Sequence, residues 1–178
     1  MTSPLAALTL AALSALGDPA PDTLPLVQVQ AMQFQSGDVA SQLRQYVAFC
    51  AASAKAEYVV DCLAERFNVA ADGLGRTGDT AELYRALKQA SHDLAAVSRK
   101  YASATTAPLV LQTSAFTTTR PIRPVAPDDL RPSNAAATAV LEEAELTLLR
   151  SSTRSPNVLA FSQVAEIVGS AKVLLRAG

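Results

Sequence analysis

The sequence predicts an all-α domain, a four-helix bundle-like fold of two antiparallel helix pairs joined by a proline-rich extended crossover. The chain of 178 residues is rich in alanine, has no Trp, and contains five Phe and four Tyr. Small side chains favour closely packed helices over an aromatic-rich β-sandwich. Apolar residues recur every three or four positions over four segments, and prolines gather between the second and third segments. At this length we expect a single helical domain over residues 38–178.

Residues 1–20 resemble the apolar and small-residue zones of a secretory signal, although no Lys or Arg precedes Arg44. Their apolar run of about thirteen residues is too short to span a bilayer, which needs about 20. We expect an exported chain, periplasmic or secreted, that does not span the membrane. The alternative is a short buried N-terminal helix in a cytoplasmic protein. Residues 21–37 follow as an extended arm, in which Val27 and Val29 alternate with glutamines.

The first predicted helix covers residues 38–71, which contain neither Gly nor Pro. Its apolar side chains recur at spacings of four and three, as in an amphipathic helix. Three acidic residues, Glu57, Asp61 and Glu65, fall four apart on one side of it. A cation site needs ligands that converge from several directions, so we interpret this row as a solvent-exposed acidic face.

The two cysteines bring two inferences about this helix into conflict. Cys50 and Cys62 are twelve residues apart, so in an unbroken helix their Cα atoms would lie about 18 Å apart. A disulfide allows about 4.4 to 6.8 Å. An exported chain with two cysteines nevertheless normally pairs them. Three outcomes stay open: a sharp turn within residues 51–56 that lets the cysteines bridge a helical hairpin, reduced thiols in the cytosol, or bonds to other molecules.

The second predicted helix covers residues 79–102 and is the most regular one. The glycines of residues 72–78 match G-x-G-x-x-G, but a helix rather than a strand precedes them, so we interpret them as a helix-terminating loop and not a dinucleotide site. Asp79 and Glu82 have the spacing of a capping box. The heptad-like apolar seam that follows favours antiparallel packing on the preceding helix.

The crossover, residues 103–132, contains five prolines, which block a helix and favour extended chain. One interpretation is a partner-docking strip with three projecting arginines, Arg120, Arg123 and Arg131. We favour the other, a strap that crosses the bundle, because apolar residues in its second half could be buried and long structureless loops are uncommon in compact domains.

Two further helices are predicted at residues 133–152 and 156–176. Ser133 has the chemistry of an N-cap for the first, and Ser155 with Pro156 resembles an N-cap followed by proline at the first helical position for the second. Gly169 interrupts the last helix at a cost of about 1 kcal/mol relative to Ala. Close approach of a neighbouring helix would explain it.

Catalytic constellations are lacking at the level of sequence. Fifteen basic and sixteen acidic residues give a net charge of −1 without a charged block, so no nucleic-acid partner is expected. Ser91, His92 and Asp93 are consecutive in a predicted helix and therefore point in different directions, which excludes a local Ser-His-Asp relay. One His and two Cys are too few for a structural zinc site. We predict no catalytic, cofactor-binding or metal-binding residue, and no cofactor.

Three classes of function remain. The one we favour is a non-enzymatic exported helical protein that serves as a protein-binding or assembly (scaffold) module with an unknown protein partner. The alternative is a helical bundle that binds a small apolar ligand, which requires a cavity among the alanine-rich faces. The second alternative is a hydrolase or lyase that uses dispersed carboxylates. Cys50 and Cys62, as a disulfide candidate, are the most specific feature of the sequence.

Overall fold

The computed structural model describes residues 39–176, and the predicted signal (1–20) and extended arm (21–37) lie outside the described residues. Within the described range five α-helices pack together without a regular strand, which confirms the predicted all-α bundle. In chain order the elements are helix 39–53, η1 (Ala56–Tyr58), α2 (Val59–Asp72), η2 (Gly78–Thr80), α3 (Ala81–Lys100), η3 (Pro127–Asp129), α4 (Leu130–Ser152) and α5 (Val158–Arg176).

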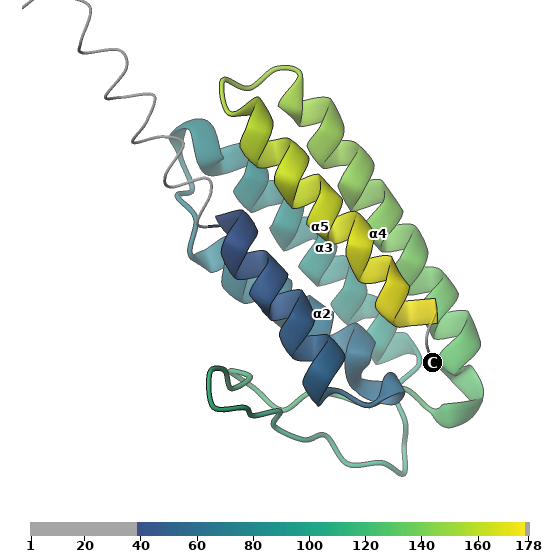
Figure 1. Ribbon diagram of the computed structural model, residues 1–178. Helices are drawn as coiled ribbons and strands as arrows, with labels where there is room; N and C mark the ends of the chain where they lie inside the picture. The colour runs from purple at the N-terminus through teal and green to yellow at the C-terminus, as the bar shows by residue number, and fades with distance from the viewer. Residues whose placement is uncertain (1–38, 177–178) are drawn as a thin grey trace, which may run out of the picture.

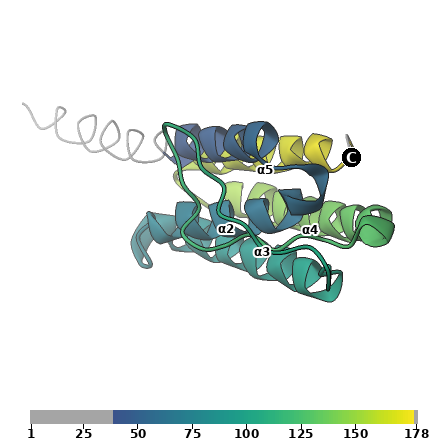
Figure 2. The same cartoon turned by 90° about the horizontal axis from the view of Figure 1, so that it is seen from below.

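The helices form two antiparallel pairs, as predicted. α2 packs on α3 across a short loop that contains Gly78, whose φ of 71° suits glycine, and α4 packs on α5. α3 also packs on α4 and so joins the two pairs (Figure 1). Seen from below, helix 39–53 and α5 lie on one side of the bundle, α3 lies on the other, and α2 and α4 lie between them (Figure 2).

The predicted continuous helix over residues 38–71 is wrong, because the chain turns back after helix 39–53. Ala54 and Lys55 are not helical, and Lys55 is extended with φ −69° and ψ 161°. Of the three outcomes left open, the structure has the helical hairpin, with Cys50 and Cys62 joined in a disulfide and their Cα atoms 5.8 Å apart. Residues 51–56 favour a continuous helix by only a few tenths of a kcal/mol each. Packing the apolar stripes of both helices into one core outweighs this local preference.

α2 lies at the centre of the bundle, and every residue from Val59 to Phe67 is buried. Asp61 and Glu65 are therefore buried too, with 0% and 3% of their surface exposed. The prediction of a solvent-exposed acidic face is wrong for these two residues, because a helix enclosed on all sides has no solvent face.

The starts of α3 and α4 differ from their predicted caps. α3 is preceded by the 3-10 turn η2, and its N-cap is Thr80, whose hydroxyl donates to the carbonyl of Gly75 (3.0 Å). α4 begins three residues before the predicted cap, since η3 with Pro127 starts the turn. Ser133 is consequently an interior helical residue, and among the described residues its buried hydroxyl has no hydrogen-bond partner.

The start of α5 is close to the prediction. Ser155 does accept a hydrogen bond from the N–H of Asn157 through its hydroxyl (3.1 Å), but regular helix begins only at Val158. The loop after α4 therefore forms a turn, which the Ser155 hydroxyl helps to stabilise.

The proline-rich crossover forms a two-armed ribbon, residues 101–126, which we call the strap. Three isolated antiparallel bridges pair its arms: Ala102 with Val125, Leu109 with Ile122, and Gln112 with Thr117. The tip turns within residues 113–116. Prolines remove N–H donors from the arms, so the bridges do not extend into a continuous ladder. The strap passes across helix 39–53 and α2 (Figure 2).

Candidate functional site

Asp61 is the main attachment point of the strap. Its two carboxylate oxygens accept hydrogen bonds from both terminal nitrogens of Arg120, Nη1 to Oδ2 at 2.6 Å and Nη2 to Oδ1 at 3.0 Å. Oδ2 also accepts the backbone N–H of Arg123 (2.7 Å). The Asp61 side chain is fully buried, whereas 40% of the Arg120 side chain is exposed. The ion pair therefore lies at the edge of the core, with its acid inside and its base reaching solvent.

These contacts decide the charge state of the pair. Burial alone would raise the pKa of Asp61, but the hydrogen bonds from Arg120 and from the Arg123 N–H, with the Arg120 charge, outweigh it and hold that pKa below its ordinary value. The hydrogen bond to Asp61 raises the pKa of Arg120. Both groups are charged at neutral pH, so the strap is held by a charge-assisted bidentate pair.

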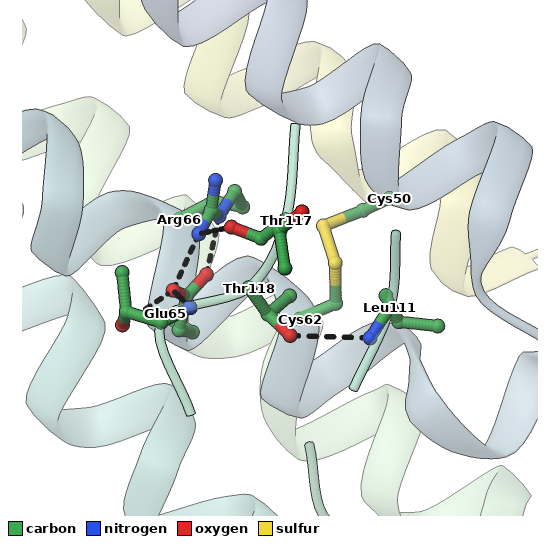
Figure 3. The surroundings of a disulfide bond; sticks show 8 residues. Cys50, Cys62, Glu65, Arg66, Leu111, Thr117 and Thr118 are labelled. Carbon is green, nitrogen blue, oxygen red and sulfur yellow. Dashed lines mark hydrogen bonds and ion pairs between the residues drawn. A yellow bond between two sulfur atoms is a disulfide. The ribbon is translucent and has the colours of Figure 1, made fainter. Parts of the chain in front are cut away.

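Glu65, one helical turn further along α2, holds the next part of the strap. Its Oε1 accepts both the backbone N–H and the hydroxyl of Thr119, each at 2.8 Å. Its carboxylate is also paired with the buried guanidinium of Arg66, which donates to the carbonyl of Thr117 (3.2 Å) (Figure 3). Two consecutive residues of α2 thus bind the backbone of the same arm.

Aromatic rings enclose the Arg66 guanidinium. It lies over the rings of Tyr46 and Phe49 from helix 39–53, 5.0 and 5.4 Å from their centroids. Phe116 from the strap tip meets both rings edge-on, at 5.4 and 5.9 Å. A weakly hydrated guanidinium suits such a position. Arg66 therefore joins helix 39–53, α2 and the strap tip.

The disulfide lies beside this cluster. Cys50 on helix 39–53 and Cys62 on α2 are both fully buried. The two arms of the strap run next to it, where the N–H of Leu111 donates to the hydroxyl of Thr118 (3.1 Å) and the N–H of Thr118 donates to the carbonyl of Leu111 (2.9 Å) (Figure 3). Disulfides are typical of an oxidising compartment.

We call this set the strap anchor: Asp61, Glu65, Arg66, Arg120 and the disulfide Cys50–Cys62. Its carboxylates are buried and already accept hydrogen bonds from guanidinium, hydroxyl and backbone groups. The strap anchor therefore joins α2, helix 39–53 and the strap.

The three arginines of the predicted docking strip do not form one projecting row. Arg120 turns inward to Asp61, and Arg123 is half-buried and uses its backbone N–H. Arg131 is exposed in the first turn of α4. Partner docking through Arg123 and Arg131 stays a prediction.

The Ser91-His92-Asp93 triplet is dispersed, as its helical spacing indicates. Ser91 is buried and donates to the carbonyl of Ala64 (2.7 Å), whereas the His92 side chain is 70% exposed beside Asp93. Among the described residues, no group of three or more His, Cys, Asp or Glu side chains is placed to hold a metal ion.

The α4–α5 pair carries most of the exposed apolar side chains of the described chain. Five of the six large ones belong to it, and each is between 41% and 62% exposed. We call them the α4–α5 face: Leu146, Leu149, Val158, Leu159 and Val173. Singly exposed apolar residues are ordinary, whereas a contiguous apolar patch marks an interaction surface, and these five side chains share one helix pair.

A shallow groove of about 330 Å³ lies between α3 and α4. Its lining contains small apolar side chains and several polar residues of the same two helices, and the apolar ones are Ala86, Ala90, Ala139, Val140 and Ala144. A larger open concavity of about 920 Å³ nearby is lined mainly by polar and charged residues of α3.

α5 is the one helix within residues 39–176 that is long and apolar enough to cross a membrane, with a mean hydropathy of 1.6. Its inner side chains, including Phe161, Val164 and Val168, are buried in the bundle. A core helix has the same length and composition, so we interpret α5 as part of the bundle.

Sequence comparisons give no relative on which to base a function. No protein-family model matches the chain, and neither a curated protein nor a solved structure shows significant similarity to it.

The buried charges are the residues that sequence reasoning missed. Asp61, Glu65 and Arg66 stand among Val60, Cys62, Leu63 and Ala64, so this part of α2 has no polar face for them to occupy. Charged residues within a helix that is apolar on all sides indicate charges that are buried and paired. Arg120 of the crossover was the available partner for Asp61.

Proposed function

We propose that this protein is a non-enzymatic exported helical module, periplasmic or secreted, that binds protein through the α4–α5 face. The observation that carries the proposal is the concentration of exposed apolar side chains on this one helix pair. Covering apolar surface of this kind with a partner stabilises the complex by about 25 cal/mol per Å² of surface removed from water.

The strap anchor supports the same proposal. The disulfide favours an oxidising compartment. The ion pair and the disulfide together hold the strap and helix 39–53 on α2, on the side of the bundle away from the proposed binding face. A rigid scaffold loses little conformational entropy when one of its faces binds.

Photo-crosslinking in the native host tests the binding proposal. A photoreactive amino acid placed at Leu149 or at Leu159 should give discrete protein adducts, because both positions lie on the α4–α5 face. Val110, on the strap, is comparably exposed and provides the matched control. Failure to form adducts at both face positions, or the same adducts from Val110, would contradict the proposal.

Intact mass tests the export proposal. Chain isolated from its native compartment should be shorter than the printed sequence by the signal segment, and alkylation should label Cys50 and Cys62 only after reduction. A full-length chain with two freely alkylated thiols would place the protein in a reducing compartment.

The second candidate function is binding of a small apolar ligand in the α3–α4 groove, which the alanine-rich lining favours. Filling the groove with Val140→Phe should abolish binding of an apolar fluorescent probe. Ala135→Phe, at an exposed position of α4 that does not line the groove, is the control. Equal probe binding by both variants and the parent chain would rule the groove out.

A further inference from the structure

α4 has a second seam on its outer side, in which Leu146 and Leu149 lie among alanines, a glutamate and a threonine. The inner seam is buried in the core and contains Ala137, Leu141, Ala144 and Leu148. The outer seam advances by four, three, four, three and four residues, and every member is exposed: Ala135, Ala139, Glu142, Leu146, Leu149 and Thr153. We call it the α4 ridge.

Two opposite charges on α4 lie symmetrically about Leu146. Glu142 lies four residues before Leu146, and Arg150 lies four residues after it. Both are exposed. The ridge is therefore acidic on one side of Leu146 and basic on the other, so it is complementary to itself when a second ridge runs in the opposite direction.

We propose that two copies of this chain pair through their α4 ridges, antiparallel about a two-fold axis at Leu146. Glu142 of each copy then faces Arg150 of the other, and the two Leu146 side chains meet at the centre. A parallel pair would instead set Glu142 against Glu142 and Arg150 against Arg150, so the charges select the antiparallel form. This inference rests on the proposed function, because it names the partner of one part of the α4–α5 face.

A second copy fits this ridge better than an arbitrary partner does. Glu143 and Arg150 are 3.7 Å apart within one copy, but both side chains are about two-thirds exposed, so this pair alone contributes little. An isologous dimer about this axis buries the Leu146 side chains of both copies and places two interchain ion pairs beside them.

Sedimentation velocity of the full chain over a wide concentration range tests the dimer. The parent chain should show a reversible monomer–dimer equilibrium. Leu146→Asp should weaken self-association by more than about tenfold, because it buries two carboxylates at the axis. Val173→Asp, at an exposed apolar position on α5 outside the ridge, should leave the dimer intact. Circular dichroism shows whether each variant is folded.

A charge exchange tests the register. Glu142→Arg and Arg150→Glu should each weaken the homodimer, since each sets like charges opposite one another twice. An equimolar mixture of these two single variants should dimerise as the parent chain does, because both interchain contacts then pair opposite charges. Weakened homodimers of both single variants, together with a mixture that equals the parent chain, indicate the antiparallel arrangement, because in a parallel pair the mixture would associate more tightly than the parent chain does.

A parent chain that is monomeric at every concentration overturns the inference, and so does a mixture that fails to restore the dimer. Either result leaves the proposed function standing if Leu159 still gives adducts with another protein. Absence of adducts with other proteins at both Leu149 and Leu159, together with a normal dimer, would reverse that outcome, so the two proposals fail separately.

Discussion

The strap side and the α4–α5 side of this bundle are stabilised in different ways. The strap is held by a bidentate ion pair, a second buried carboxylate, an enclosed guanidinium and a disulfide. The α4–α5 pair relies on ordinary helix packing and one partly exposed ion pair between Glu145 and Lys172. The specific polar and covalent contacts are thus concentrated where the backbone has no regular hydrogen bonds of its own. The regular helix pair does not need them, and its outer surface remains exposed for binding.

The strongest test of this contrast is to remove the base that neutralises Asp61. Arg120→Ala leaves a fully buried carboxylate with the Arg123 N–H as its remaining strap donor, which should lower the free energy of unfolding by about 3 to 5 kcal/mol. Asp61→Ala should cost less, because the released Arg120 is 40% exposed and can be hydrated. Equilibrium unfolding in urea measures both values.

Arg131→Ala is the matched control for this experiment, since Arg131 belongs to the same crossover but is exposed at the start of α4. It should change stability by less than about 0.5 kcal/mol. Comparable losses for Arg120→Ala and Arg131→Ala would mean that the ion pair does not hold the strap.

Removing the disulfide should have the next largest effect. The double variant Cys50→Ala/Cys62→Ala frees a loop of twelve residues and should lose about 3 kcal/mol, mainly because the unfolded chain becomes less constrained. Hydrogen exchange should accelerate in helix 39–53 and the strap more than in α4 and α5. Uniform acceleration over the whole chain would contradict the division of the bundle into two differently stabilised sides.

A smaller effect is expected from acid. The pKa of Asp61 is lowered in the folded protein, so its stabilising contribution is complete above the unfolded pKa of about 3.9 and is lost as the pH falls through the folded value. Stability should therefore fall below about pH 4, and Asp61→Asn should flatten this dependence. Asp79→Asn, an exposed control, should keep the slope of the parent chain. Identical slopes for both variants would show that Asp61 is not responsible.

The sequence sufficed to predict the regular parts of this fold. The class, the two helix pairs and the approximate extents of α3, α4 and α5 follow from apolar periodicity and from the positions of Gly and Pro. These signals are local, and each belongs to a helix with one core-facing stripe.

The turn after helix 39–53 and the strap anchor were not predictable in the same way. Ala54 and Lys55 contain no local signal for a turn, which arises from long-range packing and from the bond between Cys50 and Cys62. The partners of Asp61 and Glu65 are more than fifty residues away in the chain. Spacing within one helix indicates which residues share a face, but it does not reveal what covers that face.

The smallest predicted effect concerns Gly169, where the sequence suggested a close approach of another helix. A Cβ added there would lie 2.6 Å from Oε1 of Glu145, whose carboxylate pairs with Lys172 at 2.7 Å. Gly169→Ala should thus gain about 1 kcal/mol in helix propensity and lose part of this gain, because the flexible Glu145 carboxylate must move away from Lys172. In a Glu145→Ala background, Gly169→Ala should stabilise the protein by about 1 kcal/mol, because the carboxylate that would have to move is absent. Thermal unfolding of the four proteins of this cycle measures the coupling, and an equal effect of Gly169→Ala in both backgrounds would show that Glu145 is not the reason for the glycine.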